Sequence, residues 1–148
     1  MTTQATLLES EQALGASLVP QNQRNTFLPR HFGGSFLRLE SMVYDFAGDF
    51  MQGYRGGYWE FYEVSNGAGF LVLADDAPAH LCVSLNGYEG TMSQEAAGIT
   101  LTLFALSHLS FALDANGAST RQVSEQYHLL RDYALGHAEA AQILAAID

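Results

Sequence analysis

The chain has 148 residues, of which 48% are hydrophobic and 11% aromatic, so it is long enough for one globular domain and far from the composition of disordered proteins. Sixteen acidic and six basic residues give a net charge of −10, which disfavours direct binding to the phosphates of nucleic acids. The single cysteine, Cys82, excludes an internal disulfide and suits a reducing cytoplasm, where we expect the protein to act.

The N-terminal part of the chain changes character near residue 18. Residues 1–17 are polar without a sustained apolar face, so we expect a flexible extension before one folded domain over residues 18–148. A short helix is predicted from Pro20 to about Thr26 and is expected to end before Pro29, because the residue preceding a proline disfavours helical backbone. Apolar residues then recur at helical spacing, which predicts a helix over residues 36–52.

The middle of the chain is typical of short antiparallel strands. Its aromatic and β-branched runs are separated by Asn-Gly turns, one of them at the centre of a five-residue loop. Sequential strands joined by tight turns pair antiparallel. The predicted strands are Tyr58–Val64, Phe70–Ala74, about His80–Leu85, and a possible fourth, Tyr88–Met92.

The C-terminal part is predicted to be helical. Residues 96–113 contain no charged residue and approach the length of a membrane span, but polar residues inside the segment and the lack of arginine clusters at its ends indicate a buried helix instead. Ser93, or Thr91 with Gln94, can cap it. Two more helices should follow, one ending at Gly136. We therefore expect an α+β fold: a single compact domain with a small three- to four-stranded antiparallel sheet packed against several helices.

Few groups in the sequence suit catalysis or metal binding. No histidine has another three or four residues away, and Cys82 has no second cysteine at ligand spacing. His80 shares a strand face with Cys82, but a lone cysteine between apolar residues is more often a small buried side chain. Glu60 and Glu63 should lie on opposite faces of their strand, so they cannot share a site. We predict no catalytic residue, cofactor or metal, and only ligation by residues distant in the sequence stays open.

The most interface-like stretch is the aromatic run beside the first Asn-Gly turn, because tyrosine, tryptophan and arginine are favoured anchors of protein interfaces. An alternative is that Trp59 and Phe61, which share one face, simply build core. The two carboxylates one turn apart on the helix over residues 36–52 are added as candidates. The candidate partner-binding residues are Asp45, Asp49, Tyr54, Arg55, Tyr58, Tyr62 and Asn66.

Several stretches, in order over residues 18–148, together resemble the ArdB/KlcA family of antirestriction proteins. They are Leu18–Pro20, Leu28–Gly33, Gly56–Tyr62, Ser65–Gly67, Asn86–Gly90, Ala96–Leu106, Tyr127–Arg131, Glu139–Ala141 and Ala146–Asp148. The resemblance implies an α+β antirestriction domain that relieves type I restriction of incoming DNA and is carried on plasmids and other mobile genetic elements. It supplies no catalytic residues, and it implies a type I restriction-modification complex or an associated host factor as the partner.

Two mechanisms and one unrelated role remain open for such a protein. DNA mimicry needs long rows of carboxylates at phosphate spacing, yet Asp45 and Asp49 have no third member on their C-terminal side. Arginines at positions 38, 55, 121 and 131 interrupt the acidic surface further. Non-catalytic interference through protein–protein contact is therefore favoured, with a DNA mimic in the enzyme's DNA groove, or an unrelated small intracellular binding domain, as alternatives. Neither direct nucleic-acid binding nor membrane insertion is expected.

Overall fold

The computed structural model describes residues 14–148, so most of the predicted extension over residues 1–17 lies outside the described residues. The predicted boundary at residue 18 falls within the first strand. In chain order the elements are β1 (Ala16–Leu18), η1 (Gln21–Gln23), α2 (Arg24–Phe32), η2 (Gly33–Ser35), α3 (Phe36–Phe50), β2 (Trp59–Val64), β3 (Gly69–Leu73), β4 (Ala79–Val83), β5 (Tyr88–Met92), α4 (Gln94–Ala115), α5 (Arg121–Leu135) and α6 (Ala140–Ile147).

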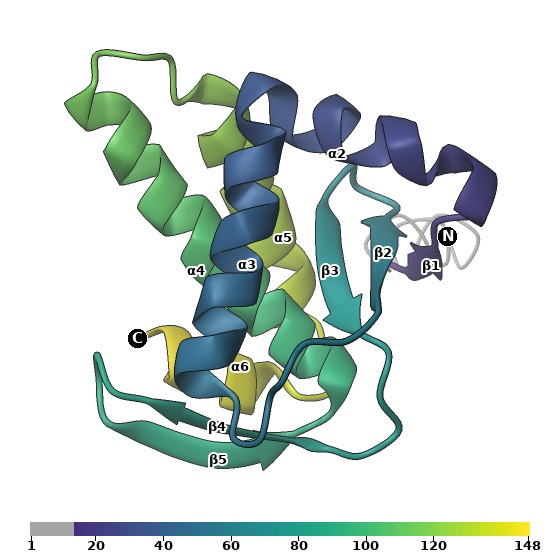
Figure 1. The fold of residues 1–148 in the computed structure, drawn as a ribbon, viewed down its shortest axis with the longest axis vertical. Coiled ribbons are helices and arrows are strands. Elements are labelled where there is room, and N and C mark those ends of the chain that lie inside the picture. The colour runs from purple at the N-terminus through teal and green to yellow at the C-terminus, as the bar shows by residue number, and fades with distance from the viewer. Residues whose placement is uncertain (1–13) are drawn as a thin grey trace, which may run out of the picture.

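The α+β class is confirmed, and the strands divide into two antiparallel sheets rather than one. β1, β2 and β3 form the first sheet in that order, with Ala16 opposite Val64 and Trp59 opposite Leu73. β4 and β5 form a separate hairpin. The exposed segment 74–78 carries the chain away from β3, and a bridge between Met51 and Leu81 joins β4 to the end of α3. The hairpin therefore closes one end of the molecule (Figure 1).

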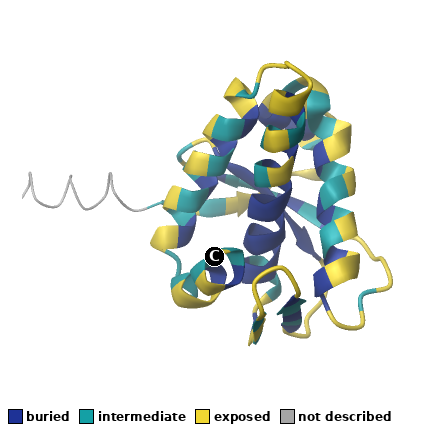
Figure 2. Cartoon of the chain, turned by 90° about the vertical axis from the view of Figure 1, so that its left-hand side faces the viewer, coloured by how far each residue is buried: buried dark blue, intermediate teal, exposed yellow. Residues whose placement is uncertain are grey.

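Helix α4 forms the centre of the core, as the uncharged run predicted. It packs against α3, α5, α6 and β3, and its first half is buried on every side (Figure 2). The helix is long and apolar enough to cross a membrane by composition alone, but 72% of its most apolar stretch is buried inside the fold. Ser93 caps it, its side chain accepting a hydrogen bond from the Ala96 amide at 3.1 Å.

Two helices cover the outer edge of β3. The Leu71 amide donates to Thr102 Oγ1 on α4 at 3.2 Å, and the Gly69 amide donates to Gln126 Oε1 on α5 at 3.1 Å. Both amides are buried and point away from β2, so without these side chains they would lack a partner. The approach is close because Gly98 on α4 lies directly over Leu71. A small-residue face of α4 thus lets the helix contact the backbone of the strand.

Removal of the Thr102 hydroxyl should weaken the fold measurably. Thr102→Val keeps the volume but strands the buried Leu71 amide, so we expect a loss of about 1–3 kcal/mol in the free energy of unfolding. Thr100→Val is the matched control, because the fully buried Thr100 hydroxyl donates to the Ala96 carbonyl, which also accepts within the helix. Urea denaturation of both variants tests this, and equal losses would contradict the assignment.

The prediction that the first helix ends before Pro29 was wrong. α2 runs from Arg24 to Phe32 with Pro29 inside it. Pro29 cannot donate to the Asn25 carbonyl, but both residues are exposed, so water can satisfy that carbonyl. The opposite side of the helix buries Phe27, Leu28, His31 and Phe32. Burial of this face outweighs the local cost of the proline.

Candidate functional site

The structure separates the seven candidate residues into two regions. Asp45 and Asp49 lie one turn apart on the exposed side of α3, and Tyr54, Arg55 and Tyr58 follow in the glycine-rich segment that joins α3 to β2. These five residues occupy one continuous stretch of chain along and after α3. We treat this stretch as the candidate interface.

Aromatic residues gather in and beside this stretch, and we call Tyr44, Tyr54, Tyr58 and Trp59 the aromatic patch. The buried Trp59 ring lies 5.3 Å from the Tyr44 ring and 5.9 Å from the Tyr54 ring, and its Nε1–H donates to the Tyr54 hydroxyl at 3.1 Å. Tyr58 is 49% exposed, with the Arg24 guanidinium 4.9 Å from its ring centre. Trp59 therefore builds core, as the alternative proposed, while it holds Tyr54 at the surface.

Tyr44 connects the patch to α3. Its hydroxyl donates to Glu40 Oε2 at 2.8 Å. Burial, and then the Glu40 carboxylate, raise the pKa of Tyr44 far above its ordinary value, so the ring stays protonated and neutral. The patch thus presents tyrosines that pack on the buried Trp59, a combination that suits protein contact.

A hollow of about 180 Å³ opens next to Tyr54 and Arg55. It lies between residues 51–56 and residues 73–79, and Gln94 also lines it, with its side-chain amide donating to the Ala77 carbonyl at 3.1 Å. Gly53 and Gly56 have φ values of 77° and 90°, a backbone region that strongly favours glycine. These glycines therefore set the path of the loop that presents Tyr54 and Arg55.

Tyr62 and Asn66 do not belong to this surface. Tyr62 lies on the other side of the first sheet, where its ring stacks on Phe70 at 5.4 Å and Phe70 stacks on Tyr133 of α5. The Asn66 side chain donates to the Leu129 carbonyl at 2.9 Å and accepts from the Ala68 amide at 3.0 Å. Asn66 therefore binds α5 directly and Tyr62 packs toward it through Phe70, so both lie outside the candidate interface.

A buried histidine joins α2 to the β2–β3 hairpin, a role that the sequence did not indicate. His31 is 6% exposed; its Nδ1 lies 3.0 Å from the Gly67 carbonyl oxygen and its Nε2 lies 2.8 Å from Glu63 Oε1. Arg30 also pairs with Glu63. The His31 hydrogen bond holds the pKa of Glu63 below its ordinary value, and Arg30 acts in the same direction against partial burial.

Two glutamines of α5 complete this junction. Gln126 Nε2 donates to the Gly67 carbonyl at 2.9 Å, and Gln122 Nε2 donates to the carbonyls of Arg30 and His31 at 3.0 and 3.2 Å. A polar hollow of about 480 Å³ lies over the same residues of α5. Because the buried polar groups satisfy one another, the junction is suited to holding the fold together rather than to chemistry.

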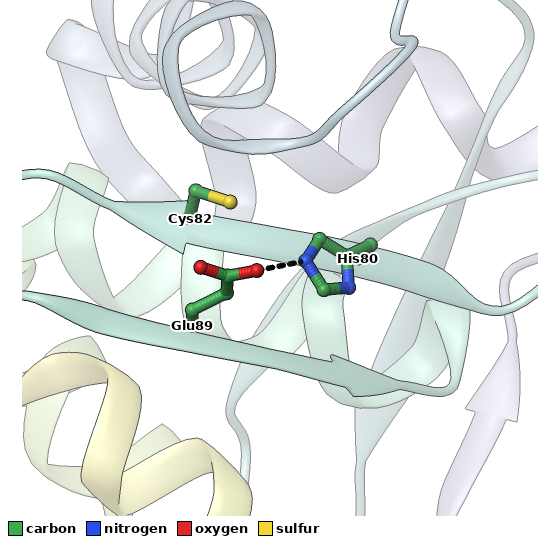
Figure 3. Close-up of side chains that lie close together, drawn as sticks. All are labelled: His80, Cys82 and Glu89. Atoms are coloured by element: carbon green, nitrogen blue, oxygen red, sulfur yellow. Dashed lines mark hydrogen bonds and ion pairs between the residues drawn. The ribbon is translucent and has the colours of Figure 1, made fainter.

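The second sheet brings together groups that could hold a metal. His80, Cys82 and Glu89 lie on the outer face of the β4–β5 hairpin, with their ligand atoms all within 4.8 Å of one another (Figure 3). The predicted shared face of His80 and Cys82 is confirmed. Glu89, from the opposite strand, was missed because no motif spacing indicates a cross-strand neighbour.

The sequence matches one protein family, both in a family model and in individual relatives. Residues 52–148 match the family model described as "Antirestriction protein". Two Escherichia coli proteins named antirestriction protein KlcA are 41% and 40% identical to this chain, over 93% and 90% of its length and 97% and 92% of theirs. The chain belongs to the antirestriction protein family.

This antirestriction protein also has the same fold as a solved structure. It is described as "The structure of the KlcA and ArdB proteins show a novel fold and antirestriction activity against Type I DNA restriction systems in vivo but not in vitro". It is 38% identical, with a TM-score of 0.81, and the match covers 91% of this chain and 95% of that chain. The resemblance recognised in the sequence is therefore confirmed.

Two of the stretches that carry the family resemblance meet at one place. Leu28–Gly33 contributes His31, and Ser65–Gly67 contributes the carbonyl that His31 and Gln126 both bind. In this antirestriction protein these stretches therefore support the fold.

Proposed function

We propose that this protein relieves type I restriction of incoming DNA inside the cell, without catalysis, by binding a protein of the restriction complex or a host factor that the complex needs. The observation that carries the proposal is the solved relative with 38% identity, whose activity against type I systems is described as present in vivo but not in vitro. A protein that simply blocked the DNA groove would be expected to inhibit the purified enzyme as well. Dependence on the cell favours a partner beyond the isolated enzyme.

The arrangement of charge supports protein contact over DNA mimicry. The exposed side of α3 carries Arg38 and Ser41 before Asp45 and Asp49. The two aspartates are therefore preceded by a positive and a neutral side chain, and they form a row of only two carboxylates. On α4 the first-turn acid Glu95 is paired with His137 at 2.6 Å. Such short and mixed rows do not reproduce the regular charges of a DNA strand.

The candidate interface offers the anchors that protein partners use. Exposed Arg55 and half-buried Tyr54 line a hollow, exposed Tyr58 follows them along the chain, and Asp45 and Asp49 supply negative charge on the preceding helix. Interface energy concentrates in a few such tyrosines and arginines, each worth about 2 kcal/mol or more at a hot spot. We therefore assign partner binding to this surface.

The double variant Arg55→Ala/Tyr58→Ala tests the assignment in cells. Restriction relief is measured as the efficiency of plating of unmodified phage on a strain that carries a type I system. Loss of two anchors should reduce relief by at least about tenfold, since 1.4 kcal/mol corresponds to tenfold in affinity. Phe111→Ala is the matched control, because Phe111 is 74% exposed at the other end of α4.

Three further results would decide between the explanations. Full relief by the double variant, at normal protein level and unfolding midpoint, would overturn the assignment to this surface. If Arg55 and Tyr58 are the main anchors, Asp45→Asn/Asp49→Asn should reduce restriction relief less than Arg55→Ala/Tyr58→Ala does. If the purified protein instead prevents a purified type I enzyme from binding DNA, strongly at low salt and weakly at high salt, DNA mimicry replaces our proposal.

A further inference from the structure

Three potential metal ligands converge on the outer face of the β4–β5 hairpin. Alternation along β4 buries Ala79, Leu81 and Val83 against the core and turns His80 and Cys82 to the other face. The register places Glu89 directly opposite Cys82 and Thr91 opposite His80. A histidine, a thiol and a carboxylate therefore lie on one small area of a well-supported hairpin (Figure 3).

The distances suit a single ion. His80 Nε2 lies 3.0 Å from Glu89 Oε2, and the ligand atoms of all three residues lie within 4.8 Å of one another. Bonds of 2.0–2.3 Å in a tetrahedral zinc site place neighbouring ligand atoms about 3.3–3.7 Å apart. Glu89 is exposed and Cys82 is partly exposed, so small side-chain rotations can bring the three atoms to these separations without moving the backbone.

A neighbouring residue already orients the imidazole. His80 Nδ1 lies 3.0 Å from Thr91 Oγ1, so Nδ1–H can donate a hydrogen bond to the hydroxyl when an ion takes the place of the Nε2 proton beside Glu89. Metal-bound histidines are commonly held by such a hydrogen bond on the second nitrogen. The same geometry disfavours a cysteine–histidine catalytic dyad, because Thr91 and Glu89 occupy both ring nitrogens.

The chemistry of the ligands favours zinc. Thiolate and imidazole are typical ligands of zinc, whereas calcium and magnesium take oxygen ligands. A surface ion pair between His80 and Glu89 alone would contribute little to stability and would not involve the only cysteine of the chain.

We propose that His80, Cys82 and Glu89 bind one Zn²⁺ ion, with water in a fourth position open to solvent. This inference does not rest on the proposed antirestriction mechanism. Binding would join β4 to β5 across the open face of the hairpin, because Cys82 and His80 lie on one strand and Glu89 on the other.

The direct test uses tag-free, full-length, reduced protein stripped of metal with a chelator. Titration with zinc should show one site per chain by calorimetry, and cobalt in place of zinc should produce the charge-transfer absorption of a cobalt–thiolate bond. Zinc should also slow alkylation of Cys82, and a chelator should restore the rate. An absence of zinc binding at micromolar concentration, or a cobalt complex without the thiolate band, would overturn the proposal.

Variants show whether these three residues form the site. Cys82→Ser, His80→Gln and Glu89→Gln should each weaken zinc binding by at least about tenfold. Loss of a residue that only hydrogen-bonds to a metal ligand already lowers metal affinity by about tenfold or more, and these three residues are proposed as the ligands themselves. His128→Gln and Glu125→Gln are matched controls, because both residues are exposed on α5. Circular dichroism checks that each variant is folded. Equal affinity in Cys82→Ser and the controls would place the zinc elsewhere and contradict the assignment.

Discussion

Gly98→Ala should lower the free energy of unfolding by about 2–3 kcal/mol, although alanine is the better helix former. A Cβ atom at this position would lie 2.2 Å from the Leu71 carbonyl oxygen and 3.0 Å from Val72 Cγ2. The closer contact is with backbone, which cannot rotate away, so α4 and β3 must separate. That separation also stretches the hydrogen bond from the Leu71 amide to Thr102. Thermal and urea unfolding measure the loss.

Gly48→Ala is the matched control for this effect. Gly48 lies on the exposed side of α3, and a Cβ atom there meets nothing within 4 Å. The same substitution should therefore stabilise the protein by about 0.5–1 kcal/mol, the ordinary helix preference for alanine over glycine. Stabilisation by Gly98→Ala as well would mean that the helix and strand are not in the close contact described.

His31→Ala should cost about 2–4 kcal/mol of stability, the second large effect we expect. The substitution removes a buried ring whose centre lies 4.6 Å from the Phe27 ring, and it leaves a cavity between α2 and the β2–β3 hairpin. The Gly67 carbonyl keeps its hydrogen bond from Gln126, and Glu63 keeps its ion pair with Arg30. Most of the lost stability should therefore come from packing. A lower urea midpoint with an unchanged slope would show it.

His128→Ala controls for the loss of an imidazole as such. His128 is exposed on α5, so the change should remain within about 0.5 kcal/mol of the parent protein. Equal stability of the His31 and His128 variants would remove His31 from the structural role assigned to it.

Much of the fold was predictable because local patterns and packing agree. The aromatic-rich run of β2 and the uncharged run of α4 each specify one kind of element. Pro29 shows the limit, since its place inside α2 depends on the burial of Phe27 and Phe32 against elements far along the chain. The division of the strands into two sheets likewise depends on the contact of β4 with Met51.

The candidate sites were harder to predict, for reasons of register and loop length. A strand that ended at Leu85, as expected, would place Glu89 opposite Ser84. The observed strand ends at Val83, and the longer turn places Glu89 opposite Cys82. Tyr62 could have been separated from Trp59 by strand alternation alone, but its stacking against Phe70 needed the pairing of β2 with β3.

The covered edge of β3 also affects how copies of this protein behave when crowded. An extended segment from another molecule adds to a sheet by finding unused amides along an edge strand. On β3 the amides of Leu71 and Gly69 are already bonded to Thr102 and Gln126, and α4 and α5 stand in the way. A second chain would have to detach both helices, and with them the core, before it could pair there. Edge-to-edge aggregation through β3 therefore requires unfolding first.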